Sequence, residues 1–143
     1  MPDHKCVTKR TDSNISVKER GRSANFKNPT RSQFLQVKVD KCLINGKEKK
    51  ADWIVTKVGV GSVIIELKGH DLDQACRQLK ATLDHPNCTP WLEAKKSMLI
   101  VCSRYPSIDT SVQRLRTAAR RQGMRLTVVC DRANFFFEDI LSA

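Results

Sequence analysis

The sequence contains no run of about 18 consecutive apolar residues, which is the length a helix needs to cross a bilayer. Its first ten residues, "MPDHKCVTKR", are polar and charged and hold no apolar stretch of the kind found in secretory signals. We therefore expect an intracellular, cytoplasmic protein that makes no membrane contact.

The chain also has no C-x-x-C pair among its six cysteines. Several cysteines lie in apolar runs, "KCLI", "LIVC" and "VVC", so we expect reduced, buried thiols. Two short clusters, His4 with Cys6 and His85 with Cys88, resemble parts of zinc sites, but neither has four ligands at zinc-finger spacing. The pattern therefore disfavours zinc.

No G-x-S-x-G motif occurs, none of the three histidines falls in a nucleophile pattern, and no base-reading module is recognisable. What the chain has instead is positive charge: the net charge is +11, of which +8 lies in residues 1–50 and +3 in residues 101–143. Charge concentrated in this way favours a polyanionic partner such as nucleic acid. The alternative is a basic surface that only keeps the protein soluble.

The hydrophobic pattern from residue 34 onward predicts one α/β or α+β domain. We expect three antiparallel strands within 34–68, with a turn at Asn45–Gly46. A helix over 70–85, a strand within 97–106, a helix over 109–123 and a strand over 124–132 follow, and the last two strands form a parallel βαβ unit. The prediction is a mixed central sheet of about five strands flanked by helices. Residues 1–33 are expected to be a basic arm or short helix, and 34–143 the core domain.

Two charged residues interrupt the apolar strand "VGSVIIELKG". Glu66 and Lys68 are two residues apart, so they point to the same face of a strand. By itself this pattern is explained by a structural ion pair. If the strands on either side of "KVGVGS" form a hairpin, however, Asp52 lies beside residues 66–68. Two carboxylates held together repel each other unless a cation sits between them, and Mg²⁺ binds through one or two carboxylates.

The stretch "ADWIVTKVGVGSVIIELKG" resembles the motif of the PD-(D/E)XK nuclease superfamily, with Asp52, Glu66 and Lys68 in its three positions. The strand–strand–strand–helix–strand order of residues 34–103 is similar to the superfamily core, the restriction-endonuclease-like fold, and "ELKG" looks like that of small bacterial single-domain members. Ala51 stands where the motif has proline, which removes no ligand.

The resemblance implies a metal-dependent nuclease. Asp52, Glu66 and the backbone carbonyl of Leu67 would bind Mg²⁺ or Mn²⁺, and Lys68 would position the attacking water. Some members of the superfamily use a glutamine on the helix that follows, where this chain has Gln74 and Gln78. Members often have a further acidic residue from the N-terminal region, for which Glu19 is the candidate. Gln78 is the catalytic candidate of the two glutamines. An ordinary surface role is the more common explanation of a helix glutamine such as Gln78 and of a lone glutamate among basic residues such as Glu19.

Five basic residues are candidates for phosphate contacts, which position nucleic acid without reading its sequence. They lie on the turn before Asp52, at a strand end and along one helical stripe: Lys49, Lys50, Arg104, Arg114 and Arg121. The expected substrate is DNA in preference to RNA, and a homodimer is possible. The alternative function is a non-catalytic nuclease-fold protein that binds nucleic acid or a protein partner, as an inhibitor or immunity protein does.

Overall fold

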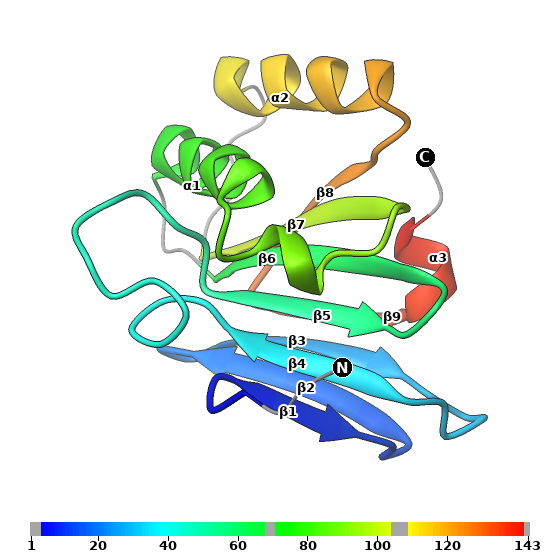
Figure 1. The fold of residues 1–143 in the computed structure, drawn as a ribbon. Helices are drawn as coiled ribbons and strands as arrows, with labels where there is room; N and C mark the ends of the chain where they lie inside the picture. The colour runs from blue at the N-terminus through cyan, green and yellow to red at the C-terminus, as the bar shows by residue number, and fades with distance from the viewer. Residues whose placement is uncertain (1–3, 68–70, 104–108, 142–143) are drawn as a thin grey trace.

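The computed structural model describes residues 4–67, 71–103 and 109–141, which form an α/β protein with two sheets (Figure 1). The larger sheet has the strand order β1-β4-β5-β6-β7-β8 and the smaller one β2-β3-β9. Three α-helices accompany them in the described residues. The elements in chain order are β1 (Val7–Arg10), β2 (Asn14–Glu19), β3 (Arg22–Lys27), β4 (Phe34–Lys38), β5 (Trp53–Lys57), β6 (Gly61–Leu67), α1 (Leu72–Asp84), a short 3-10 turn (Thr89–Trp91), β7 (Lys96–Cys102), α2 (Thr110–Arg121), β8 (Leu126–Cys130), β9 (Arg132–Phe136) and α3 (Phe137–Leu141).

The predicted antiparallel meander is confirmed as β4, β5 and β6. The turn between β5 and β6 includes Gly59, whose φ of 77° is a conformation that glycine adopts without strain. The register pairs Trp53 with Ile65 and Ile54 with Ile64. Continued one residue further from the turn, this register brings Asp52 opposite Glu66.

The predicted βαβ unit is confirmed as β7–α2–β8, and a second parallel crossover links β6 to β7 through α1. Each helix starts at an aspartate whose carboxylate accepts a backbone hydrogen bond: Asp71 from Gln74 N at 3.0 Å and Asp109 from Val112 N at 2.9 Å. These caps fix where each crossover helix begins. Because β6 and β7 pair in parallel, their carboxyl ends lie at the same edge of the sheet.

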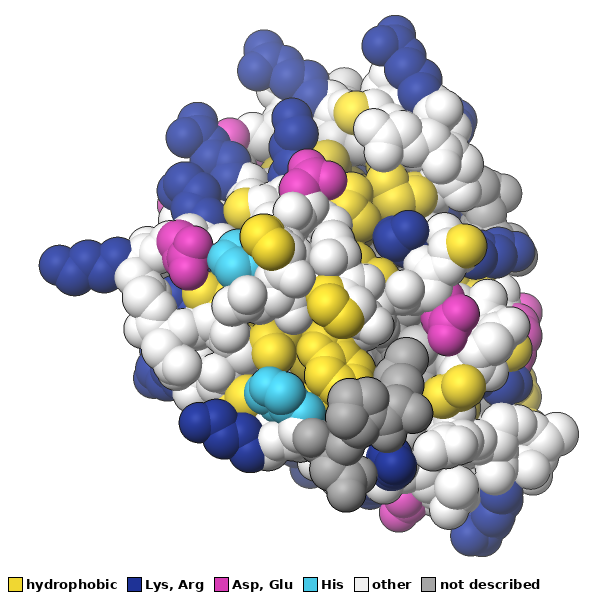
Figure 2. Space-filling view, in the orientation of Figure 1, with side chains coloured by type: hydrophobic (Ala, Val, Ile, Leu, Met, Phe, Trp, Pro, Cys, Tyr) yellow, Lys and Arg dark blue, Asp and Glu magenta, His cyan; other side chains and the backbone are white. Residues whose placement is uncertain are grey.

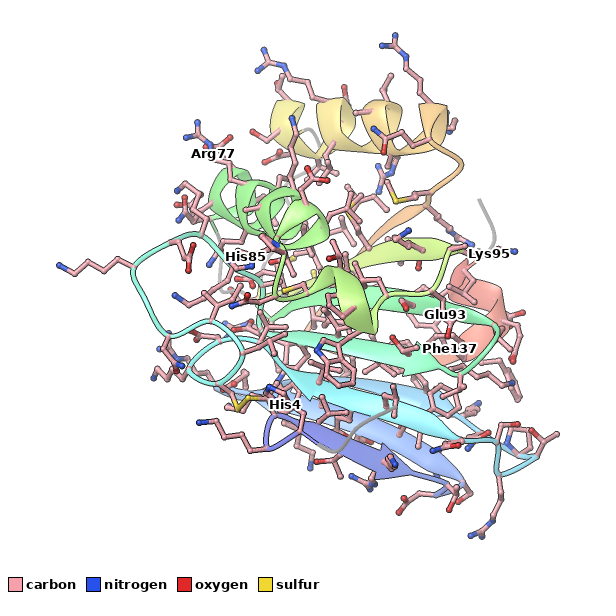
Figure 3. All side chains as sticks on the ribbon, in the orientation of Figure 1. His4, Arg77, His85, Glu93, Lys95 and Phe137 are labelled. Atoms are coloured by element: carbon pink, nitrogen blue, oxygen red, sulfur yellow. A yellow bond between two sulfur atoms is a disulfide. The ribbon has the colours of Figure 1, made fainter. Side chains whose placement is uncertain are left out.

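The central sheet is covered on both faces, and every residue of β6 is buried. One face, with Ile54 and Ile64, packs against α1 and α2. The other, with Val63 and Ile65, packs against the smaller sheet and α3. Figure 1 shows these layers, with α1 and α2 above the central strands, and Figure 3 shows Phe137 of α3 at the right-hand end.

The expectation of an arm or short helix over residues 1–33 is wrong for the described part of that segment, which forms β1, β2 and β3. Apolar residues alternate with polar ones in both β2 and β3, and Ile15, Val17, Ala24 and Phe26 are buried against the central sheet. The sheet expected to have about five strands therefore has six, with a second sheet of three beside it.

The expectation of reduced, buried thiols holds for Cys76, Cys88 and Cys102 but is wrong for the other three cysteines. Cys6 and Cys42 form a disulfide that joins the start of β1 to the loop after β4, and Cys130 is exposed. Disulfides are more common in oxidising compartments than in the cytoplasm. Among the described helices, none has the length and apolar character needed to cross a membrane.

Candidate functional site

The structure brings Asp52 and Glu66 side by side. Asp52 directly precedes β5, and its N–H donates to the carbonyl of Ile65 at 3.1 Å, which places it across from Glu66 on β6. Both side chains follow the parity of Ile54 and Ile64, so both face the helix layer. Asp52 Oδ2 also accepts a hydrogen bond from the Leu67 N–H at 2.8 Å. Two carboxyl groups on neighbouring strands thus meet at one edge of the sheet.

Burial dominates the electrostatics of this pair. Glu66 is 1% exposed. Burial raises the pKa of Asp52, the Leu67 N–H lowers it, and the nearby negative charge of Glu19 raises it again. A side-chain hydrogen bond with Glu66 lowers the pKa of Asp52, so the two carboxyl groups are in contact. The net shift is upward, because taking a carboxylate out of water costs more than one backbone donor returns.

The two carboxyl groups open into a cavity of about 190 Å³. Glu19, at the end of β2, and Asp40, just after β4, bring further carboxylates to its wall. The Gln78 side chain reaches it from α1, and Gln78 Oε1 is buried with no hydrogen-bond partner in the described residues. The candidates Asp52, Glu66, Gln78, Glu19 and Leu67 therefore line one cavity, although they come from four separate stretches of the chain.

Asp40 was missed by the sequence reasoning, as were three cations on the same wall. Glu19 Oε1 lies 3.6 Å from Lys38 Nζ, and Arg20 and Lys41 also line the cavity. A signal for Asp40 existed, because it ends "FLQVKVD", the strand paired with the one that Asp52 precedes. In an antiparallel pair, the end of one strand lies beside the start of the next, so Asp40 after β4 and Asp52 before β5 come to the same edge of the sheet.

Arg20 and Lys41 both have left-handed backbones, with φ values of 49° and 63°. Arg20 forms the β2–β3 turn with Gly21, and Lys41 lies in the loop held by the Cys6–Cys42 disulfide. A residue with a β-carbon adopts this conformation at a cost, and such strain is concentrated at functional sites. Two cations are thus fixed at the rim of an acidic cavity.

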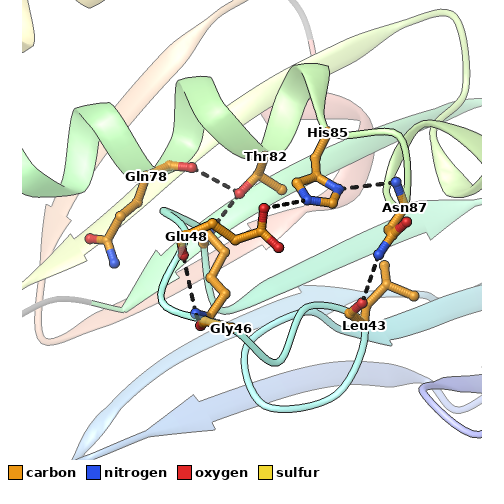
Figure 4. Close-up of polar contacts among 9 residues, drawn as sticks. Leu43, Gly46, Glu48, Gln78, Thr82, His85 and Asn87 are labelled. Carbon is orange, nitrogen blue, oxygen red and sulfur yellow. Dashed lines mark hydrogen bonds and ion pairs between the residues drawn. The ribbon is translucent and has the colours of Figure 1, made fainter.

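The loop before Asp52 is fastened to α1 (Figure 4). Thr82 Oγ1 accepts a hydrogen bond from Ala51 N at 2.6 Å and donates one to the carbonyl of Gln78 at 2.8 Å. Glu48 Oε2 lies 3.2 Å from His85 Nε2 at the end of the same helix. These contacts fix the residue next to Asp52 against α1, the helix that carries Gln78. The walls of the cavity therefore come from both the sheet and the helix layer.

The basic candidates are not gathered at the cavity. Lys49 Nζ donates to Gln74 Oε1 at 3.2 Å, and Lys50 Nζ lies 3.9 Å from Asp40 and donates to loop carbonyls, so both are near the cavity without lining it. Arg114 lies in a separate cavity between α1 and α2, and Arg121 is in the last turn of α2. Lys68 and Arg104 lie outside the described residues.

A metal-binding cluster of three acidic, histidine or cysteine side chains is not found within residues 4–67, 71–103 and 109–141. A divalent ion at this site would therefore be bound by the two contacting carboxylates of Asp52 and Glu66 and by oxygen atoms that are not carboxylates. Mg²⁺ is commonly held by one or two carboxylates, with waters and substrate phosphate completing its six ligands.

Comparison with known proteins adds no assignment. No protein-family model, curated protein or solved structure matches the chain. Function is therefore inferred from the residues of the site, because the fold class alone does not fix it.

The raised pKa of Asp52 predicts a pH-dependent stability. The folded chain binds the Asp52 proton more tightly than the unfolded chain, in which the pKa of this carboxyl group is near 3.8. The protonated group therefore stabilises the fold at a pH below 3.8, and this contribution is lost as the pH rises through the pKa of the folded state. In urea unfolding from pH 4 to 8, we expect the free energy of unfolding of the wild type to fall relative to Asp52→Asn as pH rises. A wild-type protein that gains relative to the variant would contradict the assignment.

Proposed function

We propose that the protein is a metal-dependent nuclease that hydrolyses phosphodiester bonds, in DNA in preference to RNA. The observation that carries the proposal is the contact between the carboxyl groups of Asp52 and Glu66 at one sheet edge, beside the Leu67 peptide. Two buried carboxylates in contact are stable together when a proton or a cation is shared between them. A divalent cation meets that need at neutral pH.

The fold is consistent with the restriction-endonuclease-like architecture of the PD-(D/E)XK superfamily. An antiparallel meander of β4, β5 and β6 leads through α1 to the parallel strand β7, and Asp52 and Glu66 lie on the central hairpin. This order supports the proposal because it places the two acids and the helix residue Gln78 around one cavity.

The residues of the cavity fit Mg²⁺ or Mn²⁺. Asp52 and Glu66 would supply carboxylate oxygens, the Leu67 carbonyl and Gln78 Oε1 neutral oxygens, and Glu19 a further carboxylate through a water molecule. The orphaned, buried Gln78 Oε1 is the observation that favours this set, since a buried amide oxygen without a partner is costly. A bound ion there would lower the pKa of an attacking water and polarise the phosphate.

The cations at the rim would hold the nucleic-acid backbone. Arg20, Lys38 and Lys41 line the cavity next to its carboxylates, where they would pair with the oxygens of a phosphate. We propose that Lys68, which follows Leu67 in the sequence and lies outside the described residues, orients the attacking water, as the motif implies.

The direct test is cleavage of supercoiled and linear DNA by the purified protein in Mg²⁺, Mn²⁺ or EDTA, beside Asp52→Asn. We expect cleavage with either metal, none with EDTA, and a loss in the variant. Equal cleavage by both proteins would assign the activity to a contaminant and contradict the proposal.

The alternative is a nuclease-fold protein that binds nucleic acid or a protein without turnover. It is favoured by the lack of a three-carboxylate metal cluster in the described part of the chain. Calorimetric titration with Mn²⁺ separates the two functions. A nuclease is expected to bind the ion and to lose binding in Asp52→Asn, whereas a chain with no working site binds none.

Arg20 is predicted to contribute to DNA binding at a cost in stability. Arg20→Asn places Asn-Gly, the preferred pair for this turn type, at residues 20 and 21. We expect the free energy of unfolding to rise by about 0.5–1 kcal/mol and the salt dependence of DNA affinity to fall by about one phosphate contact.

The matched control is Arg31→Asn. Arg31 also has a left-handed backbone, with φ 53°, but does not line the cavity. It is expected to show the gain in stability without the change in salt dependence. If both variants bind DNA with the wild-type salt slope in fluorescence anisotropy, Arg20 does not contact the backbone.

A further inference from the structure

A second concave surface lies between α2 and β8, away from the Asp52 cavity. Its volume is about 410 Å³, and it is lined by Arg116 and Arg120 from α2 and by the segment Met124–Val128. In Figure 1 this place, where α2 ends and β8 begins, is on the right, whereas β5 begins on the left. We call it the α2–β8 groove.

One wall of the groove is an open strand edge. β8 pairs with β7, and no strand of the described residues pairs with its other side. Successive peptide groups of a strand point to opposite sides. The Arg125 carbonyl accepts from Met98 N of β7 at 2.9 Å, so the peptide groups of Leu126 and Val128 face the groove. An unpaired edge of this kind is a template for an additional strand.

The groove is strongly basic. Three arginines line it, Arg116, Arg120 and Arg125, and none of its described lining residues is acidic. Figure 2 shows Lys and Arg side chains gathered at the top of the molecule, over α2. Arg116 Nε lies 3.4 Å from the Leu126 carbonyl, and Arg125 Nη1 donates to the backbone carbonyl of Asp139 at 3.1 Å. Two guanidinium groups are thus held in place by backbone oxygens, with donors left over for a ligand.

We propose that the α2–β8 groove binds an acidic peptide in extended conformation, which adds as a strand to β8. The peptide backbone would bond the outward N–H groups of Leu126 and Val128 and the carbonyl of Val128, while the Leu126 carbonyl keeps its contact with Arg116. The carboxylates of the peptide would pair with the arginines. This mode places an extended chain between a strand edge and a helix. It is independent of the proposed nuclease site, because no residue is shared between the two cavities.

Charge and hydrogen-bond chemistry favour this occupant over two others. A second copy joined edge to edge through β8 would bring like-charged arginine clusters together, which is destabilising. A nucleic-acid backbone offers phosphate acceptors to the arginines, but its phosphates cannot donate to the outward carbonyls of the edge. An acidic strand satisfies both the donors and the acceptors.

The test uses a fluorescein-labelled decapeptide of alternating glutamate and valine, with a control peptide in which proline replaces valine. Anisotropy titrations are made with the wild type, with Arg116→Glu/Arg120→Glu, and with Arg121→Glu, which changes charge on the same helix outside the groove. We expect saturable binding of the alternating peptide, weakened at least about tenfold by proline and by the double variant, and much less by Arg121→Glu. Circular dichroism melting shows that each variant is folded.

Amide hydrogen exchange measured by NMR supplies a second reading on the wild type. Strand addition is expected to slow exchange at Leu126 and Val128 on adding the peptide. The proposal is overturned by no binding at about 1 mM peptide, by equal loss in the double variant and Arg121→Glu, or by unchanged exchange at β8. It is likewise overturned if a single-stranded oligonucleotide binds the groove while the peptide does not, or if sedimentation shows a dimer that Arg116→Glu/Arg120→Glu strengthens.

Discussion

Glu66→Gln is expected to lower Mn²⁺-dependent DNA cleavage by about 10²–10³-fold while the protein stays folded. Glu66 is 1% exposed and shares the cavity with Asp52, so an amide of nearly the same volume removes charge without leaving a void. The neutral side chain holds a divalent ion poorly, and the loss should appear in cleavage and in Mn²⁺ affinity together. Thermal stability should be unchanged or higher, since one of two contacting carboxyl groups has been removed.

The matched control is Glu93→Gln, at the other end of the sheet (Figure 3). Glu93 Oε2 accepts a hydrogen bond from Gly59 N at 3.0 Å, a role that a glutamine oxygen keeps. This variant should cleave DNA at the wild-type rate. Cleavage by Glu66→Gln at a rate equal to that of Glu93→Gln would remove Glu66 from the site.

Phe137→Ala is expected to have the largest effect on stability. Phe137 is 0% exposed and lies edge-on to two other rings, with centroid distances of 5.0 Å to Phe34 and 5.6 Å to Phe26. It therefore joins α3 to both sheets. Truncation of a buried phenylalanine costs about 3–5 kcal/mol, and the ring pairs add to this loss. Since a domain of this size has about 5–15 kcal/mol in total, urea unfolding should shift to much lower denaturant.

Phe136→Ala is the control beside it in the chain. Phe136 is 46% exposed, and its ring contacts solvent and the ammonium of Lys27, 4.9 Å from the ring centroid. Its loss should cost less than about 1 kcal/mol. Equal destabilisation by the two variants would show that the smaller sheet and α3 do not pack on the central sheet as described.

The strands and helices from β4 to β8 were predictable because their signals are local. Alternation, an uninterrupted apolar run at β7 and aspartate caps each act within a few residues. β2 and β3 were missed although Ile15, Val17, Ala24 and Phe26 alternate, because the many polar and basic residues around them indicate an arm. The turn between them, Arg20–Gly21, is also not a typical hairpin pair.

Contacts between residues far apart in the chain could not be predicted from a single sequence. β3 pairs with β9, so Ser23 lies beside Arg132 across most of the chain. The Cys6–Cys42 disulfide likewise depends on where β1 meets the loop after β4. Register and parity were enough to bring Asp52 to Glu66, because a hairpin fixes both. The rim residues Arg20 and Lys41 follow from turn conformations that spacing does not reveal.

The most direct measurement is the position of Mn²⁺ in crystals soaked with the ion, located by anomalous scattering. We expect one strong peak between the carboxylates of Asp52 and Glu66, within about 2.0–2.3 Å of an oxygen of each, and the loss of this peak in Glu66→Gln. A peak elsewhere, or none at this pair at a concentration that supports DNA cleavage, would contradict it.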